Sequence, residues 1–173
     1  MNTLKKWLPW AFLATLLAGL VYVTTQQSYR QTANDPQIAM AEDDAAALAN
    51  GQVATISSGT VDLAISLSPY VVVYDETGKP ISGNGTLEGT LPNLPPGVFD
   101  AARSLKEDRF TWQPRTGVRS AVVLVHVNGG AGGFVMAGRS LREVEIREGQ
   151  LEAYVGAAWI VALLGTLMLV AFL

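Results

Sequence analysis

The chain has 173 residues, of which 49% are hydrophobic, and a net charge of −3 at pH 7. Because the net charge is negative and no long basic run occurs, nucleic acid is not an expected partner. The sequence contains no cysteine, which excludes disulfides, thiolate metal sites and a cysteine nucleophile.

Two uncharged apolar runs, Trp7–Val23 and Val155–Leu173, lie at the two ends of the chain. A helix that crosses a bilayer needs about 20 apolar residues, and both runs come near that length. We therefore expect four segments in chain order: a tail over 1–6, a transmembrane helix over 7–25, a domain with stalk helices over 26–152 and a second transmembrane helix over 153–173. The middle segment has the usual size of one domain, about 110–130 residues.

The short flanks predict the orientation. Lys5 and Lys6 precede the first apolar run, and no Lys or Arg follows the second. Positive charge near the ends of a span stays cytoplasmic. We expect a two-pass protein of the inner (plasma) membrane, with a cytoplasmic N-terminus and an extracytoplasmic central domain. A cleaved signal peptide is the alternative for the first run, but no A-x-A-like site follows it.

The first part of the middle segment is predicted to be helical. The helix leaving the first run should continue through Gln26–Arg30, and Asn34-Asp35-Pro36 predicts a new helix start, with Asp35 as cap and proline in the first turn. An alanine-rich stretch follows and ends at Asn50-Gly51. For Val61–Leu67 the sequence leaves a strand and a last helical turn open.

The remainder of the middle segment predicts mostly strands. The expected elements are a buried strand over Pro69–Tyr74, a turn over Asp75–Gly78, a return strand over Lys79–Ser82, a bend over Gly83–Thr86, a loop over Leu91–Pro96, a short helix over Gly97–Lys106, and strands over Arg109–Gln113, Arg119–Val127 and Phe134–Ala137. Asn128–Gly133 is expected to be a flexible hairpin tip.

A long exit helix is predicted from Ser140. The residues Ser140-Leu141-Arg142-Glu143 match the capping box S-x-x-E, in which the serine hydroxyl accepts the N–H of the third following residue. No proline lies between Ser140 and Leu173. We therefore expect one continuous helix that leads into the second apolar run.

Two segments carry a resemblance to a known family. YVVVYDETGKPIS, from Tyr70 to Ser82, resembles the first hairpin of the extracytoplasmic PAS-like (single Cache type) sensor domains of bacterial membrane receptors and histidine kinases. GGFVMAGRSLREVE resembles their last strand passing into the signalling helix. The resemblance covers roughly Pro36–Glu152 and implies an α+β fold, with a PAS/Cache-like antiparallel sheet and flanking helices between two transmembrane helices.

The resemblance implies a sensory or accessory module. Receptors of that family continue into a cytoplasmic kinase, cyclase or chemotaxis module, whereas this sequence ends at Leu173 within the second apolar run. We therefore expect a protein without catalytic output of its own that acts through its transmembrane helices. The alternative is a structural or docking subunit of a larger membrane complex.

Cationic and aromatic residues that gather in the second half of the middle segment predict a site for a small anionic ligand. Arginine can fork a carboxylate and tryptophan can form a pocket wall. The candidate ligand-binding residues are Arg103, Trp112, Arg115, Arg119 and His126, with Arg109 beside them. The alternative is a basic surface that faces anionic lipid or pairs with local acids. The lone His126 is interpreted as a structural or pocket-lining residue rather than a catalytic base.

No motif for enzyme catalysis, a metal or a cofactor occurs, so none is expected. Glu42-Asp43-Asp44 reads as a solvated helix face, with weak divalent-cation binding as the alternative. Asn84-x-Thr86 matches a glycosylation sequon but is better explained by a turn that needs Asn and Gly. Asp75 is likewise expected to be a turn residue rather than a ligand contact.

The apolar runs carry small residues suited to close helix packing. These are Ala11, Ala14, Ala18 and Gly19 in the first run and Gly156, Ala157, Ala158 and Gly165 in the second. The expected partners of the chain are the lipid bilayer and, through these faces, either its own second helix or a membrane-protein partner or second copy.

Overall fold

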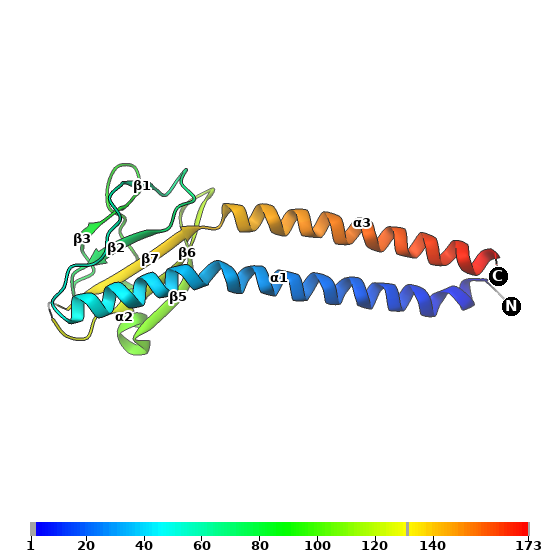
Figure 1. Ribbon diagram of the computed structural model, residues 1–173, viewed down its shortest axis with the longest axis horizontal. Helices are drawn as coiled ribbons and strands as arrows, with labels where there is room; N and C mark the ends of the chain where they lie inside the picture. Colours follow the sequence, from blue (N-terminus) through cyan, green and yellow to red (C-terminus); the bar gives the residue numbers. More distant parts are fainter. Residues whose placement is uncertain (1–2, 131, 173) are drawn as a thin grey trace. The chain divides into compact units, whose positions relative to one another are not determined.

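The computed structural model describes residues 3–130 and 132–172, with side chains throughout except at residues 30–35. The chain divides into two compact units, Met1–Thr32 with Val144–Leu173 and Ala33–Glu143. Long helices form the first unit, and a sheet with packed helices forms the second, as Figure 1 shows. The helical unit and the sheet unit are described separately below.

The first helix, α1, runs without interruption over Thr3–Ala49. The predicted helix start at Asn34-Asp35-Pro36 is therefore wrong. Proline removes one main-chain hydrogen bond from a helix interior, but residues on both sides of Pro36 continue the helix. The predicted end is correct: Gly51 has φ 72°, its N–H donates to Leu48 O, and Gln52 N–H donates to Ala47 O. These two bonds form a Schellman cap.

The helical unit pairs the N-terminal part of α1 with α3, which spans Arg142–Phe172. Thr3–Tyr29 and Arg142–Phe172 are each long and apolar enough to cross a membrane. The Trp7 indole N–H donates to Leu163 O at 3.2 Å and to Thr166 Oγ1 at 3.1 Å. The Trp159 indole N–H donates to Thr15 Oγ1 at 3.0 Å. The two helices are thus antiparallel and joined within one chain.

The small residues of the two helices fall into two groups. Ala11, Ala14 and Ala18 are half-buried, at the three- and four-residue spacing of a helix-pairing seam. At Gly156 and Gly165, in contrast, an added Cβ would meet nothing within 4 Å. Gly165 is exposed and Gly156 is half-buried, and at both positions an added Cβ would have room.

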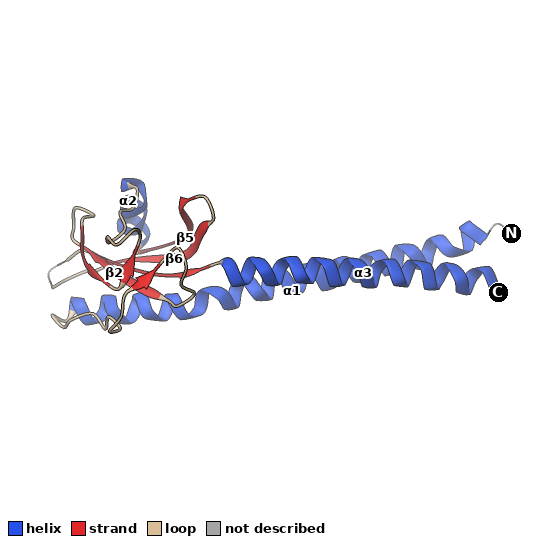
Figure 2. Ribbon diagram, turned by 90° about the horizontal axis from the view of Figure 1, so that it is seen from above, coloured by secondary structure: helices blue, strands red, loops and turns tan. Residues whose placement is uncertain are grey.

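The sheet unit is built on a five-stranded antiparallel sheet in the order β3-β2-β7-β6-β5. Its strands are β2 (Tyr70–Tyr74), β3 (Pro80–Gly83), β5 (Glu107–Arg115), β6 (Val118–His126) and β7 (Phe134–Ser140). All five were predicted, and β5 and β7 are longer than expected. Figure 2 shows the sheet in red. The expected α+β architecture with an antiparallel sheet is confirmed.

A second, two-stranded sheet pairs β1 (Val61–Asp62) with β4 (Gly85–Thr86) in parallel. The open choice for Val61–Leu67 is thereby settled, because only its first two residues form a strand. Asp62 then ends the strand, since its Oδ1 accepts the Ala64 N–H at 2.9 Å and favours a turn.

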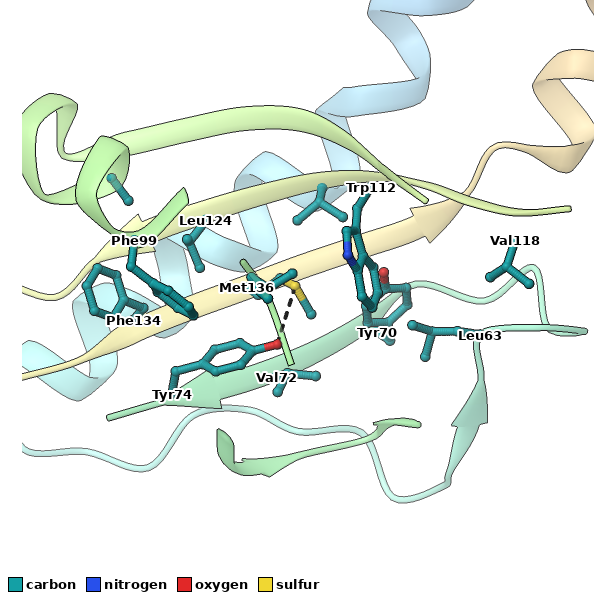
Figure 3. Packing of buried hydrophobic residues seen from close by; sticks show 13 residues of the cluster. Leu63, Tyr70, Val72, Tyr74, Phe99, Trp112, Val118, Leu124, Phe134 and Met136 are labelled. Carbon is teal, nitrogen blue, oxygen red and sulfur yellow. Dashed lines mark hydrogen bonds between the residues drawn. The ribbon is translucent and has the colours of Figure 1, made fainter. Parts of the chain in front are cut away.

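One face of the large sheet packs against α2, which spans Pro96–Leu105. Figure 3 shows the aromatic core of this face. The Phe99 ring lies edge-on to the rings of Tyr74 and Phe134, with centroids 5.3 and 5.0 Å apart. The Tyr74 hydroxyl donates to Pro92 O at 2.9 Å, which satisfies its polar end inside the core.

The other face packs against the last turns of α1. Ala41 and Ala45 contact a second cluster of buried residues that includes Val123 and Val135. Alanine lets the helix lie close to a surface of β-branched side chains. The sheet is therefore covered on both faces by helices of its own chain.

The acidic cluster at 42–44 is not a uniformly solvated face. Glu42 and Asp43 are exposed, but Asp44 is only 4% exposed. Its Oδ1 accepts the Thr55 N–H at 2.6 Å and fastens the loop after α1 to the helix. Among residues 3–130 and 132–172, no group of three or more His, Asp or Glu side chains is placed to hold a metal.

The passage from the sheet into α3 takes a single residue. β7 ends at Ser140, and α3 begins at Arg142 rather than at the predicted Ser140. The Ser140 hydroxyl accepts the Arg142 N–H at 3.3 Å. The capping box predicted the Glu143 N–H as the donor, so the donor is one residue earlier than predicted. Between Ser140 and Arg142, the Leu141 N–H donates to Arg119 O at 2.9 Å and continues the pairing with β6.

Candidate functional site

The connection between β6 and β7 is rich in glycine, and residues 128–130 at its start are exposed. Gly129, Gly130, Gly132 and Gly133 all have positive φ, from 60° to 113°. An added Cβ would overlap the Leu48 carbonyl at Gly130, the Glu76 side chain at Gly132 and the Tyr74 carbonyl at Gly133. At Gly130 and Gly133, glycine is required both for the positive φ and for the close approach to a main-chain carbonyl.

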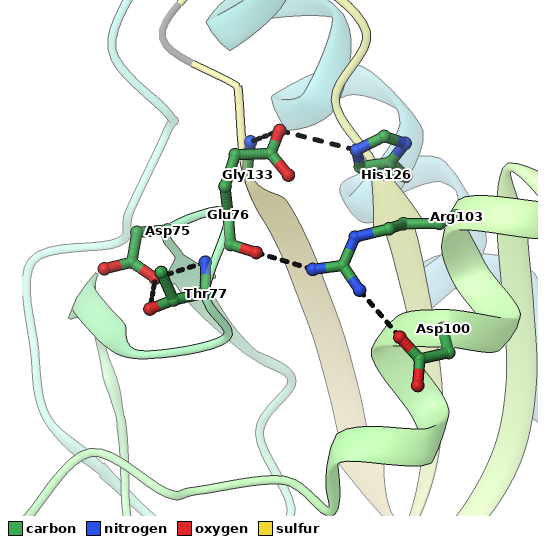
Figure 4. A network of polar contacts seen from close by, with 7 residues as sticks. All are labelled: Asp75, Glu76, Thr77, Asp100, Arg103, His126 and Gly133. Atoms are coloured by element: carbon green, nitrogen blue, oxygen red, sulfur yellow. Dashed lines mark hydrogen bonds and ion pairs between the residues drawn. The ribbon is translucent and has the colours of Figure 1, made fainter.

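The Glu76 carboxylate, from the β2–β3 turn, lies against this glycine segment. Its Oε1 accepts the Gly133 N–H at 2.8 Å and lies 3.4 Å from His126 Nε2, as Figure 4 shows. The His126 contact is within ion-pair distance but lacks hydrogen-bonding geometry, so this buried nitrogen has no hydrogen-bond partner among the described residues. The Glu76 side chain is 50% exposed and the His126 side chain 17%.

Arg103, near the end of α2, joins the same group from the other side. One guanidinium nitrogen donates to the Glu76 main-chain oxygen at 2.5 Å, and another pairs with Asp100 at 2.8 Å. The guanidinium carbon lies 4.9 Å from the centre of the Phe134 ring, a cation–π contact. The His126 ring lies 4.9 Å from the same phenylalanine.

We call this group the tip cluster. Its members come from the β2–β3 turn, α2, the end of β6 and the start of β7. The members are Glu76, Arg103, His126, Gly133 and Phe134.

The structure brings together only two of the five predicted ligand-binding residues. Arg103 and His126 belong to the tip cluster, whereas Trp112, Arg115 and Arg119 lie near the opposite ends of β5 and β6. Trp112 pairs with Ser120, six residues before His126 on β6, which is about 20 Å along a strand. The single pocket that the sequence suggested is therefore not formed.

The three remaining candidates have other surroundings. Trp112 is 8% exposed and packs in the aromatic core rather than forming the wall of an open pocket. Arg115 pairs with Glu88 at 2.9 Å. Arg119 is exposed, and its main-chain oxygen accepts a hydrogen bond from the Leu141 N–H. Arg109, named beside them, pairs with Glu107.

Asp75, next to Glu76, is fully engaged in the turn. Its Oδ1 accepts the Thr77 hydroxyl at 2.6 Å, the Thr77 N–H at 2.8 Å and the Lys79 N–H at 3.0 Å. The Thr77 hydroxyl, with the main-chain donors, lowers the pKa of Asp75. This agrees with the predicted turn role and leaves the adjacent Glu76 as the acidic residue that points into the cluster.

A shallow, open groove of about 320 Å³ adjoins the cluster between α1 and the start of β5. Its charged lining comes from Glu42, Lys106 and Glu107, and His126 forms part of its wall. The His126 side chain therefore lies beside both the groove and the tip cluster.

Within the tip cluster, the Gly133 N–H donates to the Glu76 carboxylate, and the His126 imidazole lies within ion-pair distance of it. The Arg103 guanidinium instead donates to the Glu76 main-chain oxygen and lies over the Phe134 ring. Sequence reasoning missed Glu76 because the partners of its carboxylate, His126 and Gly133, lie far along the chain (57 residues for Gly133) and the register was not predicted. Comparisons of the chain with family models, with curated proteins and with solved structures find no match.

Proposed function

We propose that the chain is a membrane-anchored extracytoplasmic module, sensory or accessory, that acts through its two apolar helices. The observation that carries this proposal is the direct passage of β7 into α3 through Leu141. β7 is hydrogen-bonded to β2 on one side and to β6 on the other. Because β7 is held on both sides, a change in the sheet would act on the first turn of α3 without an intervening flexible loop.

The local geometry of two segments supports a PAS-like, single Cache type assignment. The first hairpin has a strand that ends before Asp75 and a turn held by that aspartate. The last strand leads into a long helix. These are the two segments on which the family resemblance rests, and Lys5 and Lys6 support a cytoplasmic N-terminus.

The test measures ligand binding together with the rate of crosslinking between α1 and α3. Thr15 and Trp159 are in contact in the helical unit, so the double variant Thr15→Cys, Trp159→Cys places two thiols that a short bifunctional maleimide can crosslink, in a chain without other cysteines. A metabolite that stabilises the folded chain is expected to change the rate of crosslinking. Inserting Gly-Gly after Leu141 should keep the stabilisation and remove the effect on crosslinking.

A docking subunit is the second candidate, and one observation favours it. The sheet face toward α2 is filled by large side chains of the chain itself, including Tyr70, Tyr74, Phe99 and Phe134. A face filled in this way leaves little room for a ligand between sheet and helix. A docking subunit should gain no stability from a metabolite panel and should co-purify with one fixed membrane-protein partner.

A further inference from the structure

We propose that a groove along the pair of α1 and α3 binds an anionic phospholipid, with one acyl chain in the groove and the headgroup at Lys5 and Lys6. The proposal rests on the membrane-anchored function proposed above and adds a partner to it. Three observations carry it: the apolar lining of the groove, the two lysines at its end and a main-chain oxygen that Pro9 leaves without its helical donor.

The groove lies within the helical unit, where α1 and α3 run side by side (Figures 1 and 2). It is open, has a volume of about 570 Å³ and is lined almost entirely by apolar atoms. The lining includes Leu8, Pro9 and Phe12 of α1 and Leu163 of α3. Leu8 is 63% and Phe12 66% exposed, so the chain itself does not cover this surface. Such a surface suits the hydrocarbon chain of a lipid.

One side of the groove is fixed by Trp7. Its indole N–H donates to Leu163 O at 3.2 Å and to Thr166 Oγ1 at 3.1 Å. Because these bonds join α1 to α3, they hold the indole ring in place between the two helices. The groove therefore exists before a lipid enters it, which lowers the entropic cost of binding.

Lys5 lies on the same side of α1 as this lining. Residues three, four and seven positions apart share one face of a helix. Leu8, Pro9 and Phe12 follow Lys5 at these three spacings within the continuous helix α1. A lysine at this position can lay its aliphatic stem along the apolar surface and place its ammonium group at the headgroup level. The groove and the positive charge thus form one continuous surface.

The two lysines have no acidic counterpart in the apolar parts of the helices. Lys5 and Lys6 are both exposed, and no Asp or Glu occurs over Thr3–Tyr29 or over residues 153–172. Basic sites between membrane helices on the cytoplasmic side bind anionic headgroups. A lipid phosphate therefore supplies the negative charge that these helix parts lack.

Pro9 adds an acceptor at the same end of the groove. Proline has no N–H, so it cannot donate to the main-chain oxygen of Lys5, four residues before it in the helix. A headgroup hydroxyl can donate to this oxygen while the lysines bind the phosphate. Phosphatidylglycerol offers both groups, so it is the anionic phospholipid that fits this end of the groove.

The charge also favours a lipid over a second copy of the chain. A second copy in the same orientation would bring its own Lys5 and Lys6 to the same level of the membrane, and like charges repel. The lysines indicate a cytoplasmic end for this part of α1. The cytoplasmic leaflet is the one that presents anionic lipids, so the proposed ligand and the proposed orientation agree.

Native mass spectrometry of the full-length chain in detergent measures the binding. The probes are phosphatidylglycerol and phosphatidylcholine with identical acyl chains, titrated separately. We expect phosphatidylglycerol to bind at least about fivefold more tightly than phosphatidylcholine, since one lysine near an anionic surface contributes about this factor. Lys5→Gln should weaken phosphatidylglycerol binding about fivefold and leave phosphatidylcholine binding unchanged. Arg147→Gln, which removes an exposed charge near the other end of α3, should bind as wild type does.

A matched pair of leucines tests the place of the acyl chain. Leu8 lines the groove and Leu13 does not. Both side chains are exposed, 63% and 47%, so neither substitution removes a core contact of the chain. Leu8→Ala should weaken the binding of both lipids several-fold, because it removes apolar contact with the acyl chain. Leu13→Ala should weaken neither.

Three results would overturn the proposal. The first is equal affinity of the wild-type chain for the two lipids. The second is equal phosphatidylglycerol binding by Lys5→Gln and Arg147→Gln, which would separate the lysine from the headgroup. The third is an equal effect of Leu8→Ala and Leu13→Ala, which would place the acyl chain outside the groove. A second copy or another protein bound in place of the lipid counts against the proposal in the same way.

The lipid site and the membrane-anchored function fail in different ways. A chain that stays in the membrane fraction after an alkaline carbonate wash, but binds both lipids alike in detergent, would overturn the lipid site and leave the anchored function standing. A chain that the wash releases would overturn the anchored function and, with it, the lipid site that rests on it.

Discussion

Asn84 and Val71 are joined by two hydrogen bonds: the Asn84 side-chain Oδ1 accepts the Val71 N–H at 2.8 Å, and the Asn84 N–H donates to Val71 O at 3.0 Å. Asn84 is 6% exposed and lies between β3 and β4. It therefore continues the pairing of β2 where β3 has ended. The asparagine of the sequon is a structural residue, as the turn interpretation expected.

Replacing Asn84 with alanine should destabilise the sheet unit by about 1–3 kcal/mol, because the buried Val71 N–H loses its acceptor. Asn84→Asp keeps an acceptor oxygen and should destabilise the sheet unit less than Asn84→Ala does. Thermal unfolding of the purified chain in detergent measures the difference. Asn93→Ala, at an exposed loop position, is the matched control. An equal effect of Asn84→Ala and Asn93→Ala would contradict the assigned role.

The second prediction concerns the glycine segment between β6 and β7. Gly130→Ala adds a methyl group against the Leu48 carbonyl at a residue with φ 60°. Gly117 has φ 79° and nothing within 4 Å of an added Cβ. Gly117→Ala should therefore lower the free energy of unfolding only by the conformational penalty of about 1 kcal/mol. Gly130→Ala should lower it clearly more, because the methyl group also overlaps the carbonyl. Similar unfolding temperatures for the two variants would show that this segment is as loose as the sequence suggested.

The third prediction follows from the buried tyrosines. Burial raises the pKa of Tyr70 from 10.0 to about 12. As the pH rises above 10, the unfolded chain loses this proton before the folded one does, so folding is favoured fully below pH 10 and progressively less up to about pH 12. Unfolding should become easier over that window, and Tyr70→Phe should flatten the dependence.

Part of the alkaline effect remains in Tyr70→Phe, because burial also raises the pKa of Tyr74. Tyr29→Phe removes a tyrosine of the helical unit that is 37% exposed and serves as the control. The measurement is the denaturation midpoint between roughly pH 8 and pH 12, a range that runs from below the ordinary tyrosine pKa to the raised pKa of Tyr70, about 12. A Tyr70→Phe profile as steep as that of wild type would contradict the prediction.

The sequence predicted the strands well because their signal is local. The run Tyr70–Tyr74 is β-branched and aromatic, and the structure buries all five residues. The alanine-rich end of α1 and its Gly51 cap are local signals too. The prediction of a helix start at Pro36 also used a local signal, and it was wrong because the helix continues on both sides of this proline.

The candidate site could not be predicted in the same way. Arg103 and His126 were named, but they were grouped with Trp112, Arg115 and Arg119 by distance along the chain. In the register of β5 with β6, Trp112, Arg115 and Arg119 lie near one end of these strands, and His126 lies at the other. Glu76 meets Gly133 and His126 only through the placement of β2 beside β7 and of β7 beside β6, which is long-range information.

The fourth prediction concerns orientation. Single cysteines at Ser82 and Asn93, in a chain without native cysteine, should react with a membrane-impermeant thiol reagent in intact spheroplasts. One at Thr3, beside Lys5 and Lys6, should react only after permeabilisation. Labelling of Thr3→Cys alone in intact spheroplasts would invert the proposed orientation and place the sheet unit inside the cell.

The last prediction concerns the glycine faces of α3. Because an added Cβ at Gly156 or Gly165 has none of the surveyed atoms of the described residues within 4 Å, we expect the variant Gly156→Leu, Gly165→Leu to leave the α1–α3 pair intact. If a second copy or a partner packs on this face, as membrane helices pack on small residues, its crosslinking in native membranes should drop several-fold.

Thr166→Val is the contrasting variant, because it removes an acceptor of Trp7 and should weaken the pair within the chain by about 0.6 kcal/mol. Maleimide crosslinking of the Thr15→Cys, Trp159→Cys pair should respond to Thr166→Val and not to the leucine variant. A chain that crosslinks to no other protein, before and after the leucine substitutions, would contradict a partner on this face of α3.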